Sequence, residues 1–358
     1  MSAGLPVRRE TIRLKRQLIP VALALTAGLV SLPRALIERL YSQGLYSALQ
    51  PLMTGASNLL PFALVDALAI AIAIGWLLAV AIDVAWHRSW STILVRVVVR
   101  TIVGAAWLYL AFLFLWGFNY KRVPLVEKLQ FAAPGTADKE AAPALLATTI
   151  EQVNALHGPA HEHEERTSLG AAFARTERDL GALRFARPGR PKTTLFDWYF
   201  RRAGVSGMTD PFFLETVVAS DLLPFERPFV IAHEWSHLAG YADEGDANFV
   251  GWLTAVRAAP TDRYSGWLFL LEELPSAVRE KERSELMNRL GEGPRADLRA
   301  IAARVEQQVN PMIATAGWHA YDKYLRLNSV EEGAASYTRI VQLVLGTKFD
   351  ADWTPVLR

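Results

Sequence analysis

The chain contains no cysteine among its 358 residues, and this absence excludes several kinds of site. Without thiols there is no disulfide, no thiolate metal ligand and no cysteine nucleophile. Any metal must therefore be held by histidine, aspartate or glutamate. An excess of either charge is also lacking, because 38 Lys and Arg oppose 36 Asp and Glu for a net charge of +2. This near balance gives no electrostatic footprint for a nucleic acid, so no nucleic-acid partner is expected.

Hydrophobic residues make up 51% of the chain, and long apolar stretches are concentrated near its start. They cover residues 18–37, 59–82 and 97–118. Each has roughly the 18 to 20 residues that a helix needs to cross hydrocarbon. We therefore predict three transmembrane helices within residues 1–118, followed by a globular domain over residues 119–358. The first stretch follows a basic segment and also fits a signal peptide, whose cleavage would leave two spans and the same topology.

Basic residues set the expected orientation of these helices. Arg8 and Arg16 belong to a cluster before the first stretch, and Arg88, Arg96 and Arg100 lie between the second and third. Lys and Arg favour the cytoplasmic side, so the N-terminus is expected inside and everything after residue 118 outside. The sequence therefore predicts a multi-pass protein of the cytoplasmic (inner) membrane. The lipid bilayer is a partner, and the globular domain lies on the extracytoplasmic side.

Helical periodicity dominates the polar remainder of the chain. Helices are expected at residues 226–239, 246–258, 267–290 with a break near Pro275, 296–310, 320–327 and 332–345. The only good strand candidates lie near residues 194–200 and 213–219. The expected fold class is therefore mainly α with a small β element.

One motif carries recognisable chemistry, the H-E-x-x-H formed by His233, Glu234 and His237. Residues four apart on a helix project from one face, so the two imidazoles can hold one zinc ion. Glu234 lies beside that face and can take a proton from zinc-bound water. Pro228 suits the first turn of such a helix and Gly240 suits its end. These neighbours favour a metal-binding helix over a chance match.

A catalytic zinc normally has a third protein ligand and one position open to water. Glu244 is the preferred candidate, because a chain break at Gly240 would let it return to the two histidines. Asp243 and Asp246 are the alternatives, and Asp243 fits a scheme in which the glycine turn delivers the ligand immediately. Asn248, four residues after Glu244, is expected to support the liganding carboxylate by hydrogen bonding.

These motifs resemble a bacterial family of membrane-anchored H-E-x-x-H proteins known as domain of unknown function 3810. The resembling positions are residues 116–120, 206–208, Pro211, Phe212, Glu215, 233–237, Gly240, Glu244, 247–249, 321–325, Asn328, Gly333, Ser336 and Tyr337. The resemblance implies a gluzincin-like zinc peptidase with Glu244 as the third ligand. The chain departs from the family at Phe213 and Leu214, where members have Thr-Gly, and at Asp246, where they tend to have Glu.

Zinc peptidases commonly use a Tyr or His to stabilise the oxyanion of the tetrahedral intermediate. His319, Tyr324 and Tyr337 are candidates for this role or for a substrate contact, with Tyr321 close to them in sequence, and each also fits an ordinary packing role. Residues 213–219 form a strand that could pair with an extended peptide by edge addition, or a core strand that never meets substrate.

Two further groups have a structural interpretation that is preferred to a functional one. Asp66 interrupts the second apolar stretch, and pairing with a neighbouring segment is preferred to a role in transport. His157, His161 and His163 lie among acidic residues, and a solvated charged segment is preferred to a second metal site.

Together these features predict transmembrane helices followed by a zincin-like metalloprotease domain with one Zn²⁺. The expected enzyme is a zinc-dependent metallopeptidase that acts on a peptide or protein substrate, with Glu234 as general base. Amides of the cell wall are a further substrate class for the same chemistry. The alternative is a non-catalytic membrane protein whose structural or vestigial zinc site serves partner binding. The presence of Glu234 favours the hydrolase, because a structural site needs ligands but no base.

Overall fold

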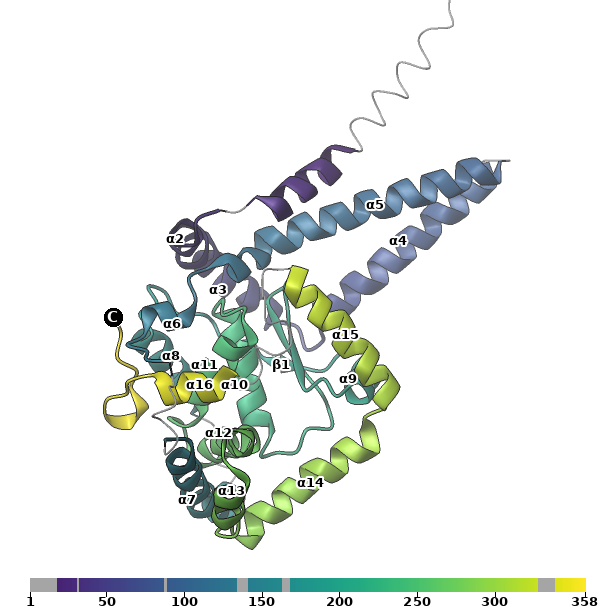
Figure 1. Cartoon of the computed structure of the whole chain (residues 1–358). Helices are drawn as coiled ribbons and strands as arrows, with labels where there is room; N and C mark the ends of the chain where they lie inside the picture. The colour runs from purple at the N-terminus through teal and green to yellow at the C-terminus, as the bar shows by residue number, and fades with distance from the viewer. Residues whose placement is uncertain (1–17, 31, 87–88, 134–140, 163–167, 328–338) are drawn as a thin grey trace, which may run out of the picture.

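A long helical hairpin projects from a mainly helical globular body in the computed structural model (Figure 1). The structure describes residues 18–30, 32–86, 89–133, 141–162, 168–327 and 339–358. The hairpin consists of α4 (Leu64–Trp86) and α5 (Trp90–Leu115), and both helices are long and apolar enough to cross a membrane. A third span would be present if the helix Leu18–Leu29 and the bent segment Arg34–Ser57 count as one. The chain is therefore suited to membrane association.

The two helices begin at positions other than those expected from hydropathy. In particular, α5 starts at Trp90 rather than near residue 97, so Arg96 and Arg100 lie inside the helix and not in a connecting loop. Their charges are compensated by Asp83 of α4, which lies 2.8 Å from Arg100 Nη2 and 3.8 Å from Arg96 Nη1. Hydropathy alone predicted a start near residue 97 and left Arg96 outside the helix, because it cannot register an ion pair with a neighbouring helix.

The segment before α4 packs against the globular body rather than remaining apart from it. It consists of α2 (Arg34–Leu36), the π-helix η1 (Ile37–Tyr46) and α3 (Ser47–Ser57). Thr54 Oγ1 donates a hydrogen bond to the Leu214 carbonyl at 2.8 Å, and Tyr46 donates to the Leu238 carbonyl at 2.8 Å. This segment and the body therefore form one packed unit.

The core of the body is formed by four helices, and α11 is its centre. They are α7 (Ala141–Glu162), α10 (Arg227–Leu238), α11 (Glu244–Ala255) and α12 (Pro260–Glu273). Every residue of α11 is buried. Such a helix must be covered on all sides, here by α10, α12, α8 and α16. Fully buried Trp252 and Trp267 pack edge to face where α11 meets α12.

The remaining helices surround this core. They are η2 (Gly117–Lys121), α6 (Leu125–Lys128), α8 (Leu169–Asp179), α9 (Asp197–Ala203), η4 (Leu274–Ala277), α13 (Glu280–Met287), α14 (Glu292–Gln308), α15 (Pro311–Leu327), α16 (Arg339–Gly346) and η6 (Ala351–Trp353). The break expected near Pro275 is confirmed, because η4 separates α12 from α13. The expected helix 332–345 is described only from Arg339, as α16.

A three-stranded sheet lies beside α10. Its order is β1 (Pro191–Lys192), β3 (Glu215–Val218) and β2 (Gly207–Asp210), with β1 parallel and β2 antiparallel to β3. The strand expected at residues 213–219 is confirmed as β3. The strand expected at 194–200 is wrong, because this segment enters α9. Asp197 lies in the first turn of that helix, and Gly204 caps its end in the left-handed conformation with φ of 71°.

Buried polar contacts join the hairpin to this sheet. The Glu215 carboxylate on β3 accepts hydrogen bonds from the backbone N–H groups of Leu64 at 2.7 Å and Val65 at 3.2 Å, in the first turn of α4. Lys192 on β1 forms a fully buried ion pair with the same carboxylate. Asp66 accepts a hydrogen bond from the backbone N–H of Leu195 at 2.8 Å. The structural interpretation of Asp66 is therefore confirmed.

Candidate metal centre

Three predicted ligands meet where α10 and α11 pack together. His233 and His237 lie one turn apart on α10, and Glu244 is the first residue of α11. Their Nε2 atoms are 3.1 Å apart, and Glu244 Oε2 lies 3.3 Å from the first and 3.4 Å from the second. All three side chains are buried or nearly so. Each of them therefore offers one donor atom to a common point between the two helices.

The return of the chain to the histidines depends on Gly240. This residue has φ of 82°, a left-handed conformation that glycine adopts without steric cost. A Cβ atom here would lie 2.9 Å from Asn119 Oδ1, so a side chain would also clash with the segment that follows α5. Glycine at this position ends α10 and lets Glu244 face back toward His237. This is the break on which the choice of Glu244 as a ligand rested.

The hydrogen bonds around the ligands leave a place for a cation. His237 Nδ1 lies 2.7 Å from the Tyr241 carbonyl, which can only accept, so this nitrogen carries a proton. In neutral His237 the Nε2 atom then presents a lone pair to a carboxylate oxygen, another acceptor. Glu244 Oε2 and His233 Nδ1 are buried without a hydrogen-bond partner among the described residues. Two imidazoles and a carboxylate are a ligand set of catalytic zinc sites, so the residues present fit the ion.

The electrostatics of the cluster favour positive charge among the ligands. Burial lowers the pKa of His237, but the Glu244 carboxylate more than offsets this and raises it to about 9. Burial likewise raises the pKa of Glu244, but the two histidines together hold it well below its ordinary value. The carboxylate is thus retained as an anion in a buried place, which is the condition for binding a metal cation.

Glu234 is buried beside the ligand cluster, next to strand β2. Its Oε2 atom accepts a hydrogen bond from Thr209 Oγ1 at 2.8 Å. Gly207 packs so closely that a Cβ there would lie 2.6 Å from Glu234 Oε1. Burial raises the pKa of Glu234, and although His233 and His237 act in the opposite direction, the net shift is upward. A carboxylate with a raised pKa is a stronger proton acceptor.

The two alternative ligands have other roles in the structure. Asp243 caps α11, where its Oδ1 atom accepts a hydrogen bond from the Asp246 backbone N–H at 3.0 Å. Asp246 accepts from the Leu125 backbone N–H at 3.1 Å. Among the described residues, neither belongs to the three-ligand group around Glu244. Asn248 is buried on α11, one turn after Glu244.

Of the C-terminal candidates, the structure brings Tyr321 to the predicted ligands. Tyr321 on α15 donates a hydrogen bond from its hydroxyl to Glu244 Oε1. His319 is exposed on the same helix. Tyr324 also lies on α15, and Tyr337 lies outside the described residues. The contact joins residues 77 positions apart in sequence, so spacing gave no signal for it beyond the place of Tyr321 in a family-like segment.

The C-terminal end of the metal helix is held by residues that follow the hairpin. Trp116 Nε1 donates a hydrogen bond to the His237 carbonyl at 3.0 Å. Arg122 Nη1 donates to the Ala239 carbonyl at 3.2 Å. Carbonyl groups at a helix end have no partner inside the helix, so these side chains complete its hydrogen bonding. This geometry gives a structural reason for Trp116 in the motif of residues 116–120.

Fold and site together define a membrane-associated helical protein with a buried His₂Glu cluster. The chain belongs to the family described as Protein of unknown function (DUF3810), whose model matches residues 41–345. The expected family membership is thereby confirmed, and the match includes the hairpin and all three candidate ligands. Neither the curated proteins nor the solved structures contain a match to this chain.

Proposed function

We propose that this protein is a membrane-anchored zinc metallopeptidase with a zincin-like catalytic domain. The observation that carries the proposal is the convergence of His233, His237 and Glu244 on one point, with Glu234 buried beside them. A structural zinc site needs only ligands, whereas a buried carboxylate next to them is costly unless it has a role. The presence of a buried carboxylate beside three candidate ligands therefore supports hydrolysis.

The residues divide into ligands and a base. His233, His237 and Glu244 would hold Zn²⁺, which supplies a polarised water and an electrophile for the substrate carbonyl. Glu234 accepts the proton of the attacking water and passes it to the leaving amine. Thr209 donates a hydrogen bond to Glu234 and fixes the orientation of its carboxylate. The raised pKa of Glu234 suits a group that must both accept and release a proton near neutral pH.

The position of the sheet supports an extended peptide as substrate. The expectation that residues 213–219 pair with a peptide is wrong, because β3 has a neighbour on each side. Strand β2 is the better candidate, since in the described part of the chain it is hydrogen-bonded to a strand on one side alone. Its residue Thr209 contacts Glu234. A peptide added along the free edge of β2 would therefore run past the proposed base.

The membrane hairpin supports a substrate near the bilayer. The hairpin joins the globular body, which contains α10 and α11, at the start of α4 and the end of α5, and its other end points away from the body (Figure 1). Arg88 lies between the two helices and a basic cluster precedes the first apolar stretch, so the positive-inside rule favours an extracytoplasmic body. The proposed enzyme is a multi-pass protein of the cytoplasmic membrane, and it cleaves peptides or proteins at the outer face of that membrane.

The proposal is tested with detergent-solubilised full chain, its Glu234→Gln variant and a control, Glu285→Gln, at an exposed position of α13. Zinc content and hydrolysis of casein and a peptide library are measured for all three. We expect one zinc at the His₂Glu site in each protein. Cleavage is expected in the wild type and the control, with a loss of at least about 100-fold in Glu234→Gln.

Two results would contradict the proposal. Zinc in all three proteins without turnover on any peptide would instead favour the alternative, a non-catalytic protein that binds a partner. Absence of zinc at His233 and His237 after metal loading would overturn both the enzyme and the structural zinc site.

A further inference from the structure

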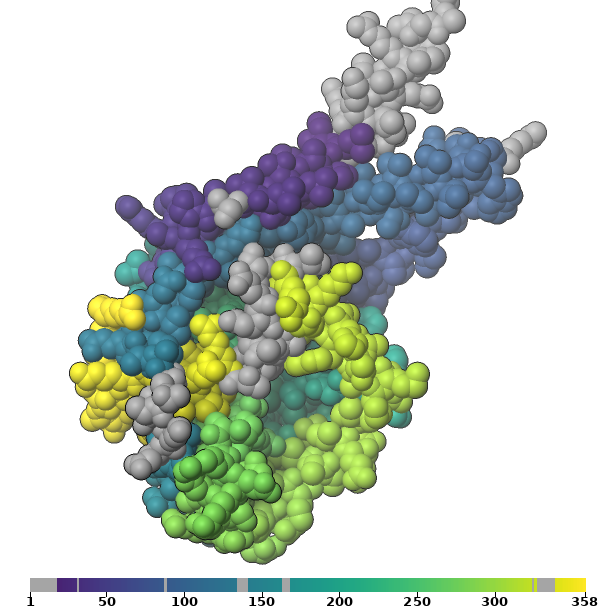
Figure 2. Space-filling model, in the orientation of Figure 1, coloured from purple at the N-terminus to yellow at the C-terminus, as the bar shows by residue number. Residues whose placement is uncertain are grey.

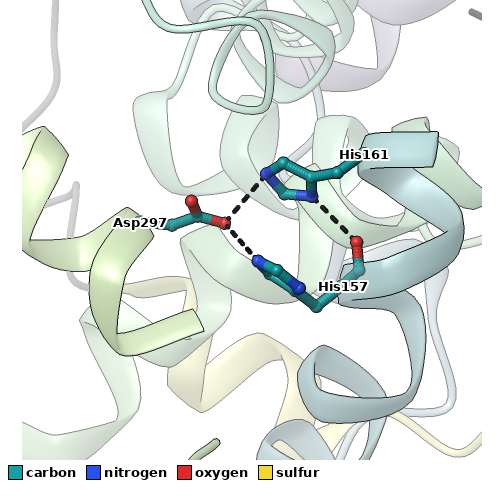
Figure 3. A group of neighbouring side chains, drawn as sticks. All are labelled: His157, His161 and Asp297. Carbon is teal, nitrogen blue, oxygen red and sulfur yellow. Dashed lines mark hydrogen bonds and ion pairs between the residues drawn. The ribbon is translucent and has the colours of Figure 1, made fainter. Parts of the chain in front are cut away.

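A second histidine pair meets a carboxylate away from the first centre. His157 and His161 lie one turn apart on α7, and Asp297 reaches them from α14 (Figure 3). Asp297 Oδ2 lies 3.6 Å from His157 Nε2 and 3.3 Å from His161 Nε2. The two histidines are partly exposed, as expected for a solvated segment, but both also face a protein carboxylate. His163 lies outside the described residues.

The hydrogen bonds in this cluster resemble those at the first centre. His161 Nδ1 lies 2.8 Å from the His157 carbonyl, an acceptor, so this nitrogen carries a proton (Figure 3). In neutral His161 the Nε2 lone pair then faces Asp297 Oδ2, another acceptor. Tyr264 already donates its hydroxyl proton to that same oxygen. Two acceptors at 3.3 Å need a positive species between them.

The stacking of the two rings bears on which positive species fits this cluster. The rings of His157 and His161 are stacked with centroids 4.3 Å apart. Because His161 Nδ1 already carries a proton, a second proton on its Nε2 atom would make that ring a cation held against the neighbouring ring. One divalent ion bound by both nitrogens and the carboxylate satisfies all three groups without protonating either ring. Imidazole with carboxylate suits Zn²⁺ and neighbouring first-row metals.

The surroundings hold the three groups in place. Asp297 is mostly buried, and the Tyr264 ring packs edge to face against both imidazoles. Gly293 on α14 lies so close that a Cβ would be 2.4 Å from the His157 ring, so glycine allows the two helices to approach. His157 and His161 remain about one third exposed, with side-chain values of 29% and 36%, which leaves a path for an ion.

We propose that His157, His161 and Asp297 form a second binding site for a divalent first-row transition metal, with zinc as the expected ion. The bound ion ties α14 to α7. Helix α14 leads directly into α15, which carries Tyr321 onto Glu244. Figure 2 shows α14 and α15 as a continuous ridge beside a hollow in this face of the molecule. The second site thus stabilises one border of the hollow and does not belong to the ligands of the first centre.

The test separates the two sites by removing the first. Metal-free full chain in detergent is titrated with Co²⁺ in a His233→Gln/His237→Gln background, and the bound metal is counted with its visible absorption. We expect one equivalent in this background and none after His157→Gln/His161→Gln is added. Asp297→Asn, which preserves shape, should weaken binding at least about tenfold. His319→Gln, which removes an exposed histidine, should leave binding unchanged.

Thermal unfolding supplies an independent measure of metal binding and shows whether each variant is folded. Zn²⁺ should raise the Tm of the His233→Gln/His237→Gln protein but not of the variant that also lacks His157 and His161. Failure of the His233→Gln/His237→Gln protein to bind Co²⁺, or retention of one equivalent after the second pair is removed, would overturn the second site. Because the first centre is already absent, either outcome is independent of the proposed peptidase activity.

Discussion

At the scale of single residues, the first centre depends on groups that hold its ligands as well as on the ligands themselves. Tyr321 reaches one oxygen of Glu244 and leaves the other directed at the histidines. His237 is fixed through its second ring nitrogen by the Tyr241 carbonyl. Such outer partners orient a ligand and select its tautomer before the metal arrives.

Removal of the Tyr321 hydroxyl should therefore weaken metal binding without abolishing it. Tyr321→Phe is expected to lower zinc affinity by about 10- to 100-fold, because Glu244 loses the donor that orients it. Tyr199→Phe, a comparable change on α9, is the control and should leave affinity unchanged. Affinity is measured by competition with a chromophoric chelator. An unchanged constant in Tyr321→Phe would show that the hydroxyl has no part in metal binding.

A second residue-scale prediction concerns pH and the buried carboxyl group of Glu177 on α8. Burial raises the pKa of Glu177 from 4.5 to about 8, against the opposing hydrogen bond from the Ala186 backbone N–H. The folded state therefore holds this proton more tightly than the unfolded chain. Its contribution to stability is complete below pH 4.5 and is lost as the pH rises toward 8, by about 1.4 kcal/mol per pH unit for this one group.

The Glu177→Gln variant should lack this pH-dependent contribution to the free energy of unfolding. Chemical unfolding from pH 5 to 9 is expected to show a shallower decline of stability for the variant than for the wild type. Equal slopes for both proteins would contradict the raised pKa.

Residue spacing predicted the sequence-local part of the site but not the part made through space. His233, Glu234 and His237 follow from one helical turn, and Gly240 with Glu244 follow from the need to turn back. Tyr321 could not be derived in this way, because its contact depends on how α15 crosses the body. The cluster of His157 and His161 was visible as spacing, but Asp297 arrives from another helix.

At the scale of elements, the approach of α10 to α11 sets the distance between the ligands. Gly251 on α11 lies against the backbone of His233, where an added Cβ would be 2.9 Å from its N and Cα atoms. Glycine is unfavourable in a helix, so its presence in α11 is explained by this close packing.

The importance of this packing is tested by comparing two glycine substitutions, one at the close contact and one at an open position. Gly251→Ala should destabilise the protein by about 1 to 3 kcal/mol and reduce zinc binding, because the helices must separate. Gly170→Ala on α8, where a Cβ meets nothing within 4 Å, should be neutral or stabilise by up to about 1 kcal/mol. Thermal unfolding and zinc content are the measurements. Equal effects of the two changes would mean that the packing at His233 is not limiting.

The prediction of secondary structure failed at α9, where the side-chain types favour a strand but the residues at the two ends favour a helix. Phe196, Tyr199 and Phe200 are aromatic residues typical of a strand, and they favour a strand in this segment. Asp197 and Gly204 supply the start and the end of a helix, and α9 forms between them. The prediction succeeded for β3, whose four residues are all buried in the centre of the sheet.

At the scale of the whole molecule, the hairpin and the globular body are joined by buried charge. The pair of Lys192 and Glu215 lies beneath the first turn of α4 and supplies that helix with acceptors for its free N–H groups. Hydropathy correctly distinguishes the apolar first third of the chain from its more polar remainder. It could not show that residues 34–57 pack onto the body, because that depends on contacts such as Tyr46 to Leu238.

Breaking this junction should affect the entire fold. Lys192→Met leaves the Glu215 carboxylate buried without its counter-charge and should cost about 3 to 5 kcal/mol. The double variant Lys192→Met/Glu215→Leu should recover part of this loss, because no lone charge remains. Unfolding in detergent by tryptophan fluorescence measures both. A single variant as stable as the wild type would show that the pair does not secure the hairpin.

The contact between Trp116 and the His237 carbonyl has a mechanical consequence. Helices α4 and α5 have 23 and 26 residues, which at roughly 1.5 Å per residue makes them longer than a hydrocarbon layer of about 30 Å. Helices that are too long for their bilayer tilt, and the tilt changes with bilayer thickness. Because α5 ends next to Trp116, such a rotation exerts a torque on the end of α10 that carries the ligands. We therefore expect lipid chain length to alter the geometry of the candidate metal centre.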